Sequence, residues 1–134
     1  MLKKRIIFTL LYDNGNFVLS RNFRLQKVGN LDWLKKNYDF SKISFYIDEL
    51  VVLDVSRKNR DLNLFCENLK ILTKDSFVPV AAGGGINSYE HASKLLKSGA
   101  DKLVLNSSLF NNKKLLEDLV KAFGRQCIVG SLDI

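Results

Sequence analysis

Two kinds of apolar segment alternate along the chain, and this alternation restricts the possible folds more than any other feature. Short runs with the composition of buried strands occupy residues 5–11, 49–54, 77–82, 102–105 and 126–132. Segments with apolar side chains at helical spacing lie between them, at residues 31–38, 61–73, 88–99 and 111–123. Continuous apolar runs indicate covered strands, whereas apolar residues every three to four positions indicate amphipathic helices. Their strict alternation predicts a parallel sheet with helices packed against it.

The length of each repeat selects one parallel architecture. A strand and its helix together span about 25–30 residues, which is the spacing of a (β/α)8 barrel of about 250 residues. The 134 residues then form four such units and a fifth strand: a single partial domain, residues 1–134, that is the N-terminal half of a TIM barrel. Residues 13–30 are expected to form a turn-rich loop. An open Rossmann-like sheet is the alternative, but no Gly-x-Gly-x-x-Gly motif follows the first strand.

A half-barrel leaves two sheet edges without partners, and such edges promote pairing or aggregation. Either the sequence is a fragment of a longer subunit, or a second half-barrel completes it. Because the sequence stops directly after a strand, without a helix to cover it, we expect a fragment.

Charge and cysteine content exclude several classes of protein. The formal net charge is +7, which favours anionic ligands in general. The basic residues are scattered, so phosphorylated metabolites and solvated helix faces explain this charge better than nucleic acid does. No apolar run reaches the roughly 18 residues of a membrane span. Cys66 and Cys127 lie in separate apolar segments, so we expect reduced thiols, no metal site and a cytoplasmic protein.

Glycines and amide-bearing residues follow two neighbouring predicted strands. Gly83, Gly84 and Gly85 end the third strand, and Asn106 and Ser107 follow the fourth. In a barrel, ligands bind at the carboxyl ends of the strands. Glycine lets backbone N–H groups approach an anion closely, and Asn and Ser donate hydrogen bonds to it. A tight turn and an ordinary helix cap would explain each loop alone, but the two together favour a phosphate site.

Two aspartates also end strands at this face. Asp54 closes the second strand and Asp133 the fifth. A carboxylate in a barrel mouth can act as a base, an acid or a ligand, but a strand-end Asp is also commonly a helix cap or a buried hydrogen-bond anchor. The only histidine, His91, is predicted on the solvent side of its helix, and no catalytic role is assigned to it.

Three charged residues begin strands at the opposite face. Arg5, Glu49 and Lys102 are expected to point toward the barrel floor. They need one another as partners, because an unpaired charge is costly to bury. Their spacing alone predicts a stabilising ring of salt bridges.

Six short motifs occur in a fixed order along the chain. They are Leu2–Ile7, Asp48–Val51 with Leu53–Asp54, Gly83–Ile86, Gly99–Lys102, Asn106–Ser107, and Phe123–Gly124 with Gln126–Val129. Together these residues resemble the synthase, or cyclase, subunit of imidazole glycerol phosphate synthase, a lyase of histidine biosynthesis. The resemblance runs over all 134 residues and covers about the first half of that family's barrel.

The resemblance implies a function for both ends of the barrel. In that family, ammonia released by a glutaminase partner enters at the floor and crosses the core. At the mouth it reacts, without a cofactor, with a phosphorylated ribulosyl-aminoimidazole nucleotide to give imidazole glycerol phosphate and a purine intermediate. The matching residues here are Arg5, Glu49 and Lys102 for the ammonia gate, Asp101 for the glutaminase contact, Gly84, Gly85, Asn106 and Ser107 for one phosphate, and Asp133 for a catalytic acid.

The sequence departs from the family where the chemistry takes place. Leu11, which cannot transfer a proton, replaces the first of two catalytic aspartates; Leu19 replaces a lysine that closes over the substrate, and Phe8-Thr9 replaces a Pro-Cys pair. Losing a general acid or base typically costs about 10²–10⁴ in rate.

A paralogous branch linked to surface-polysaccharide (lipopolysaccharide) biosynthesis is similar in these respects, and residues 53–61 also look like that branch. There the barrel relays ammonia from the glutaminase to an ATP-using sugar amidotransferase. A cyclase subunit, an ammonia conduit without cyclase activity and an inactive truncated product are therefore the three hypotheses.

Overall fold

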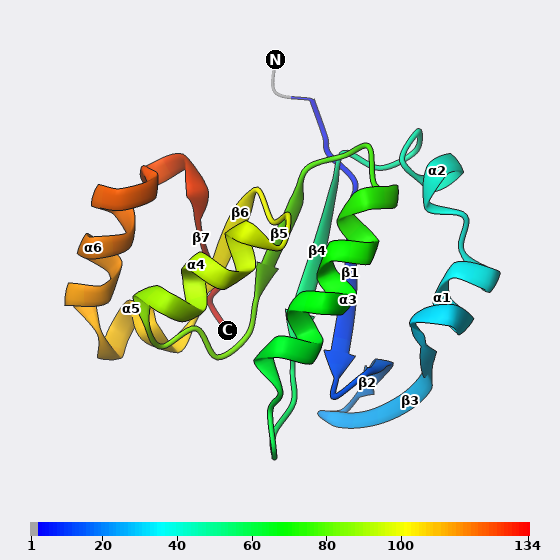
Figure 1. The fold of residues 1–134 in the computed structure, drawn as a ribbon, viewed down its shortest axis with the longest axis horizontal. Helices are drawn as coiled ribbons and strands as arrows, with labels where there is room; N and C mark the ends of the chain where they lie inside the picture. Colours follow the sequence, from blue (N-terminus) through cyan, green and yellow to red (C-terminus); the bar gives the residue numbers. More distant parts are fainter. Residues whose placement is uncertain (1–2) are drawn as a thin grey trace.

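The computed structural model describes residues 3–134, which form a seven-stranded sheet with helices packed against it (Figure 1). The strand order is β3-β2-β1-β4-β5-β6-β7. The parallel strands are β1 (Ile7–Asp13), β4 (Glu49–Asp54), β5 (Val80–Gly83), β6 (Lys102–Leu105) and β7 (Ile128–Gly130). Because these strands follow one another in chain order and each is joined to the next through helices, the predicted partial (β/α)8 barrel is confirmed.

The helices lie between the parallel strands in the sequence. They are α1 (Leu31–Asn37), α2 (Phe40–Ile43), α3 (Leu62–Asp75), α4 (Tyr89–Lys97), α5 (Ser107–Asn111), α6 (Lys113–Phe123) and the 3-10 turn Arg125–Cys127. Side chains cap the longer ones: Ser88 accepts a hydrogen bond from His91 N, and Asp61 accepts one from Leu64 N. Such caps satisfy backbone N–H groups that have no partner within the helix. Within residues 3–134, no helix has both the length and the hydropathy that a membrane span requires.

The segment expected to be a loop forms an antiparallel hairpin instead. Strands β2 (Asn16–Arg21) and β3 (Arg24–Asn30) pair with each other, and β2 also pairs with β1. Asn14 and Gly15 turn the chain with positive φ angles of 42° and 89°, the backbone that an Asn-Gly hairpin turn requires. The prediction failed because β3 and the end of β2 are polar and exposed, and the buried Phe17 and Val18 make too short an apolar run to mark a strand.

Several boundaries also differ from the predicted ones. The third parallel strand begins at Val80 rather than residue 77, and the fifth spans Ile128–Gly130 rather than 126–132. The fourth predicted helix is divided at Asn112, which caps α6 by accepting a hydrogen bond from Leu115 N. Each difference lies at an end of an element, where local pairing rather than apolar periodicity sets the limit.

Successive side chains of β4 point to opposite sides of the sheet. Leu50 and Val52 are fully buried on the side that the helices cover, whereas Val51 on the other side is only partly buried. We call this second side the inner face, because a complete barrel would enclose it. By the same alternation, Glu49 belongs to the inner face and Asp54 to the helix-covered side.

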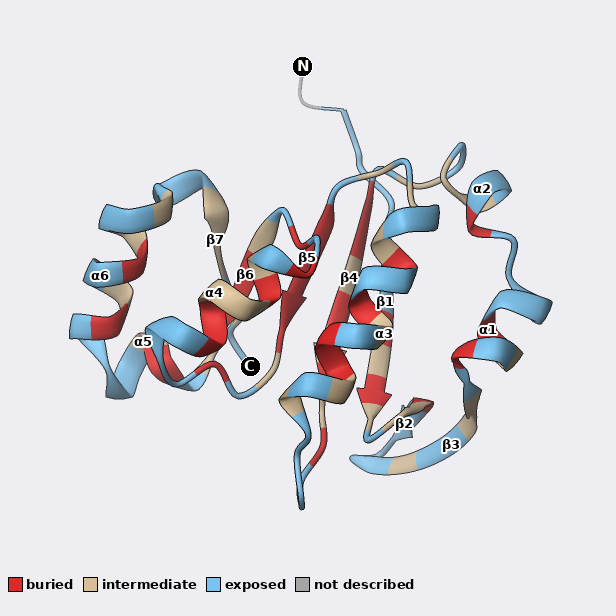
Figure 2. Cartoon of the chain, viewed as in Figure 1, coloured by how far each residue is buried: buried red, intermediate tan, exposed pale blue. Residues whose placement is uncertain are grey.

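The hydrophobic core fills the space between the helices and the sheet. Figure 2 shows the buried segments gathered where α3, α4 and α6 face the strands. The fully buried side chains include Leu69, Leu95, Leu103 and Leu119. The core therefore lies on the helix-covered side of the sheet. The inner face contributes less to it.

Candidate functional site

The three charged residues predicted at the barrel floor meet there. Arg5 Nη2 lies 3.0 Å from Glu49 Oε2, and Lys102 Nζ lies 3.3 Å from both Glu49 carboxylate oxygens. Glu49 is only 5% exposed, although the side chains of Arg5 and Lys102 are 51% and 30% exposed. A single buried carboxylate thus joins two cations that remain open to water. We call these three residues the floor cluster.

Asp101 lies at the same end of the sheet, directly before Lys102. Its Oδ2 accepts a hydrogen bond of 2.8 Å from Val80 N, and its own N–H donates to Val80 O at 2.7 Å. These bonds tie the starts of β5 and β6 together. Asp101 is exposed at this end, so it forms part of the surface next to the floor cluster.

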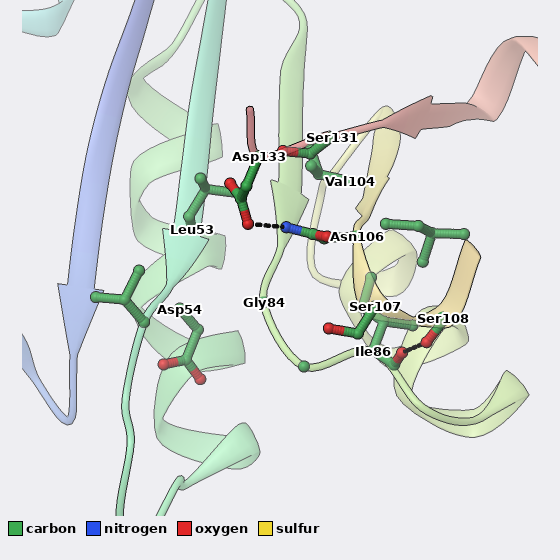
Figure 3. Close-up of a pocket in the computed structure, with 13 residues that line it drawn as sticks. Leu53, Asp54, Gly84, Ile86, Val104, Asn106, Ser107, Ser108, Ser131 and Asp133 are labelled. Atoms are coloured by element: carbon green, nitrogen blue, oxygen red, sulfur yellow. Dashed lines mark hydrogen bonds between the residues drawn. The ribbon is translucent and has the colours of Figure 1, made fainter. Parts of the chain in front are cut away.

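A cavity of about 330 Å³ opens at the other end, where the parallel strands finish (Figure 3). Its lining includes all of the residues predicted for the phosphate and the acid: Gly84, Gly85, Asn106, Ser107 and Asp133. Asn106 Nδ2 donates a hydrogen bond of 2.9 Å to Asp133 Oδ2 across the cavity. Residues 27 positions apart in sequence are brought together in this way.

The triglycine turn fits only glycine. Gly84 and Gly85 have positive φ angles of 113° and 63°, and a Cβ on Gly84 would lie 2.1 Å from Asp54 O. A Cβ on Gly83 would lie 2.4 Å from Val104 O. The turn is therefore pressed against both neighbouring strands, which leaves its backbone exposed toward the cavity. Ser108 supports the rim by donating its hydroxyl to Ile86 O.

Asp54 ends its strand beside the cavity but is engaged elsewhere. Its carboxylate points away from the Asn106–Asp133 pair (Figure 3). Its Oδ1 accepts a hydrogen bond of 3.0 Å from Ser56 N, and Arg60 Nε lies 3.4 Å from its Oδ2. Of the alternatives for this residue, the geometry favours the buried anchor over a catalytic base.

His91 is buried, so its predicted place on the solvent side of α4 is wrong. Its side chain lies on the helix face that carries Ala92 and Leu95, and only 8% of the residue is exposed. Among the described residues, no group bonds its Nε2. Burial lowers the pKa of His91 below its ordinary value, and the positive charge of Arg60 lowers it further. The imidazole is therefore held neutral at neutral pH.

Leu11 and Leu19, at two positions where the resemblance expects polar residues, occupy different places. Leu11 pairs with Leu53 in the register of β1 and β4, so it belongs to the inner face at the cavity end. Leu19 lies in β2 opposite Gln26 and is 59% exposed.

Arg60 is a site residue that the sequence did not indicate. Its guanidinium lies beside Gly85, and only its place between Asp54 and the helix-capping Asp61 could have drawn attention to it. Across residues 3–134, no group of three or more His, Cys, Asp or Glu side chains could hold a metal ion.

Comparison with known proteins identifies the family. The family model described as "Histidine biosynthesis protein" matches residues 5–134. The chain is 50% identical over 133 residues to a protein of Parasynechococcus marenigrum named "Putative imidazole glycerol phosphate synthase subunit hisF2", covering 99% of this chain and 49% of that relative.

Proteins named "Imidazole glycerol phosphate synthase subunit HisF" are also similar. Those of Helicobacter hepaticus and Streptococcus sanguinis are 36% and 37% identical, in each case over 99% of this chain and 52% of the relative. The chain therefore spans about half the length of the curated relatives it matches. Since the family model covers nearly all of the residues that form the partial barrel, the chain belongs to the histidine biosynthesis protein family.

Proposed function

We propose that this chain is the amino-terminal half of a glutaminase-dependent synthase-type barrel, which admits ammonia at the floor cluster and holds a phosphorylated ligand at the mouth. The observation that carries the proposal is that Arg5 and Lys102 both pair with the buried carboxylate of Glu49. These pairs lie at the opposite end of the strands from the glycine-lined cavity. Similarity to proteins named as synthase subunits supports the same reading.

The floor cluster suits a gate. Its contacts are ion pairs to partly exposed cations, which contribute little individually because water competes for them. Arg5 or Lys102 can therefore leave Glu49 without unfolding the sheet beneath. Asp101, exposed next to Lys102, is a suitable contact for a glutaminase that docks over this opening.

The cavity suits one phosphate group of a small molecule. Positive φ angles at Gly84 and Gly85 turn successive peptide N–H groups into a concave arrangement of the kind that binds anions. Asn106 and Ser107 add side-chain donors from the neighbouring strand end. With a volume of about 330 Å³, the cavity lies at the lower end of the range for small-molecule sites.

Leu11 favours an ammonia conduit over a cyclase. It occupies the inner face of β1 at the mouth, where the resemblance expects a catalytic aspartate, and an alkyl side chain cannot donate or accept a proton. We therefore propose the paralogous type, in which the ammonia is delivered to a separate acceptor enzyme such as an ATP-using sugar amidotransferase of surface-glycan biosynthesis.

The test is to purify the full-length protein with the glutaminase subunits encoded by the same organism. We expect a stable complex by size-exclusion chromatography, and we expect Lys102→Ala to impair glutamine-dependent but not ammonium-dependent amidation of the acceptor. Lys94→Ala is the matched control, because Lys94 forms a surface ion pair with Glu90 on α4. Failure to form a complex with any of these glutaminases would refute the conduit.

A cyclase remains the second candidate because Asp133 lines the cavity beside Asn106. The decisive assay supplies the phosphorylated aminoimidazole substrate with ammonium. Turnover by the protein with Leu11 intact would establish the cyclase, whereas no turnover together with glutaminase binding would support the conduit.

A further inference from the structure

The guanidinium of Arg60 occupies the space that a side chain at position 85 would need. A Cβ built on Gly85 would lie 1.3 Å from Arg60 Nη1 and 2.5 Å from Arg60 Cζ. Atoms cannot approach this closely, so any side chain at position 85 would have to displace the guanidinium from its present place. Neither the phosphate chemistry of the turn nor its φ angle alone explains this contact.

Arg60 is held in that place by the loop that follows β4. Its Nη2 donates to Ser56 O at 2.9 Å and lies 3.4 Å from Asp54 O. Its Nε lies 3.4 Å from the Asp54 carboxylate, whose side chain is 1% exposed. Among the described residues, none accepts a hydrogen bond from Nη1, the atom that lies against Gly85. A planar guanidinium can satisfy these partners together because its donors are fixed in one fork.

Arg60 also balances a charge that would oppose an anion. The residues that line the cavity include Asp54 and Asp133 but no lysine or arginine. Without Arg60, the buried carboxylate of Asp54 would have no cation beside it. Asp54 lines the cavity, so its negative charge would then lie close to an anion held there. A like charge at such a distance in a partly desolvated site disfavours binding.

We propose that Arg60 is a positioning residue of the anion site: its guanidinium, fixed by Asp54 and Ser56, supports the Gly84–Gly85 turn from behind and cancels the Asp54 charge. The inference rests on the proposed phosphate site. Under this proposal, the cation that favours anion binding is Arg60, which does not itself line the cavity. Glycine at position 85 leaves room for its guanidinium.

The experiment measures binding of inorganic phosphate to the purified full-length protein by isothermal titration calorimetry. Each variant is first checked by circular dichroism to be folded at the assay temperature. Arg60→Ala should weaken phosphate binding about tenfold or more, as expected for a charged group lost from a site. Arg57→Ala is the matched control: its guanidinium belongs to the same loop but donates to Phe23 O at 2.7 Å, and its loss should change the affinity less than about threefold.

A double substitution tests the contact itself. Gly85→Ala should displace the guanidinium in the parent and weaken phosphate binding strongly. In the Arg60→Ala background the same Gly85→Ala change meets no guanidinium, so its additional effect should be several-fold smaller; equal effects in both backgrounds would overturn the proposal.

Two further results decide between the inference and the function on which it rests. If the parent binds phosphate and Arg60→Ala binds it equally well, the positioning role is wrong and the phosphate site stands. If the parent binds no phosphate, both are wrong. Should Arg60→Ala fail to fold, Arg60→Lys serves instead: it keeps a charge for Asp54 but lacks the fork that reaches Ser56 and Gly85, so unchanged phosphate affinity in that variant would refute the proposal.

Discussion

The floor cluster offers the most direct test of the structure, through the substitution Glu49→Gln. This change removes one negative charge and keeps the shape of a side chain that is 5% exposed. At an effective dielectric constant of about 20, unit charges at the Lys102–Glu49 separation of 3.3 Å attract each other by roughly 5 kcal/mol before desolvation is subtracted.

The net effect must be much smaller than this gross attraction. Removing one partner of a fully buried pair costs about 3–5 kcal/mol, whereas exposed pairs contribute about 0–1 kcal/mol. Here the carboxylate is buried, but Arg5 and Lys102 are 51% and 30% exposed and recover hydration when the charge is lost. We therefore expect Glu49→Gln to lower the free energy of unfolding by about 1–3 kcal/mol.

The assay is urea unfolding at pH 7 of the parent and of two variants. Glu90→Gln is the matched control, since Glu90 Oε1 also lies 3.3 Å from a lysine, Lys94, but is 80% exposed. The control should change the free energy of unfolding by less than about 0.5 kcal/mol. If Glu49→Gln costs no more than Glu90→Gln, burial of the carboxylate does not strengthen the cluster, and the reasoning is refuted.

Three further outcomes are expected from urea unfolding. Because burial lowers the pKa of His91, the unfolded chain takes up a proton more readily than the folded chain does. The free energy of unfolding should therefore fall as the pH drops from about 7 to 5. His91→Leu should make this fall with pH less steep, and an unchanged pH dependence would contradict a neutral buried imidazole. Gly99 has a φ of 106°, and a Cβ there would lie 2.3 Å from Thr73 Oγ1, whereas Gly124 has a φ of 86° and open space around it. Gly99→Ala should therefore lower the free energy of unfolding by more than about 2 kcal/mol and Gly124→Ala by about 1 kcal/mol. Equal losses would contradict the close packing at Gly99. Leu95→Ala, at a fully buried position, should cost about 2–5 kcal/mol, and a loss below 1 kcal/mol would contradict its place in the core.

The parallel part of the fold could be predicted because its signals are local and apolar. The bounds of β4 and β6 agree with the predicted 49–54 and 102–105, since each run is apolar and begins with a charged residue. The β2–β3 hairpin could not be recognised in the same way. Its strands are joined by the turn at Asn22-Phe23, where both residues have positive φ angles, and β2 is held against β1; only Phe17 and Val18 are buried, which is too short a run to mark a strand.

The meeting of the candidate residues at each end could also be predicted, because parallel strands bring their starts to one end and their finishes to the other. What spacing could not provide is the side to which a strand-end residue points. The place of Asp54 at a strand end suggests the mouth, yet strand alternation directs its side chain to the helix-covered side with Leu50 and Val52. His91 lies four residues before the buried Leu95, so helical spacing already contained the correct answer.

The contact of Arg60 with Gly85 was beyond sequence reasoning for a different reason. It depends on the positive φ of Gly85 and on a loop that follows another strand. Side-chain periodicity carries no information about such a meeting of two irregular segments. Only the three-dimensional structure places the guanidinium where a Cβ on Gly85 would lie.

Strand β4 joins the two ends of the proposed site and limits how ammonia could pass between them. Glu49 begins this strand and Asp54 ends it, so the floor and the mouth are about 17 Å apart at a rise of about 3.3 Å per residue. Along the inner face, Val51 and Leu53 lie between these ends, and Leu53 pairs with Leu11 of β1. An apolar lining favours neutral ammonia over ammonium, because a charge is costly to remove from water. Under the proposed function, Leu11 at the position where the resemblance expects an aspartate therefore has two consequences. It lacks the acid that a cyclase needs, and it extends the apolar lining of β1 toward the mouth, where a carboxylate would otherwise stabilise ammonium as a cation.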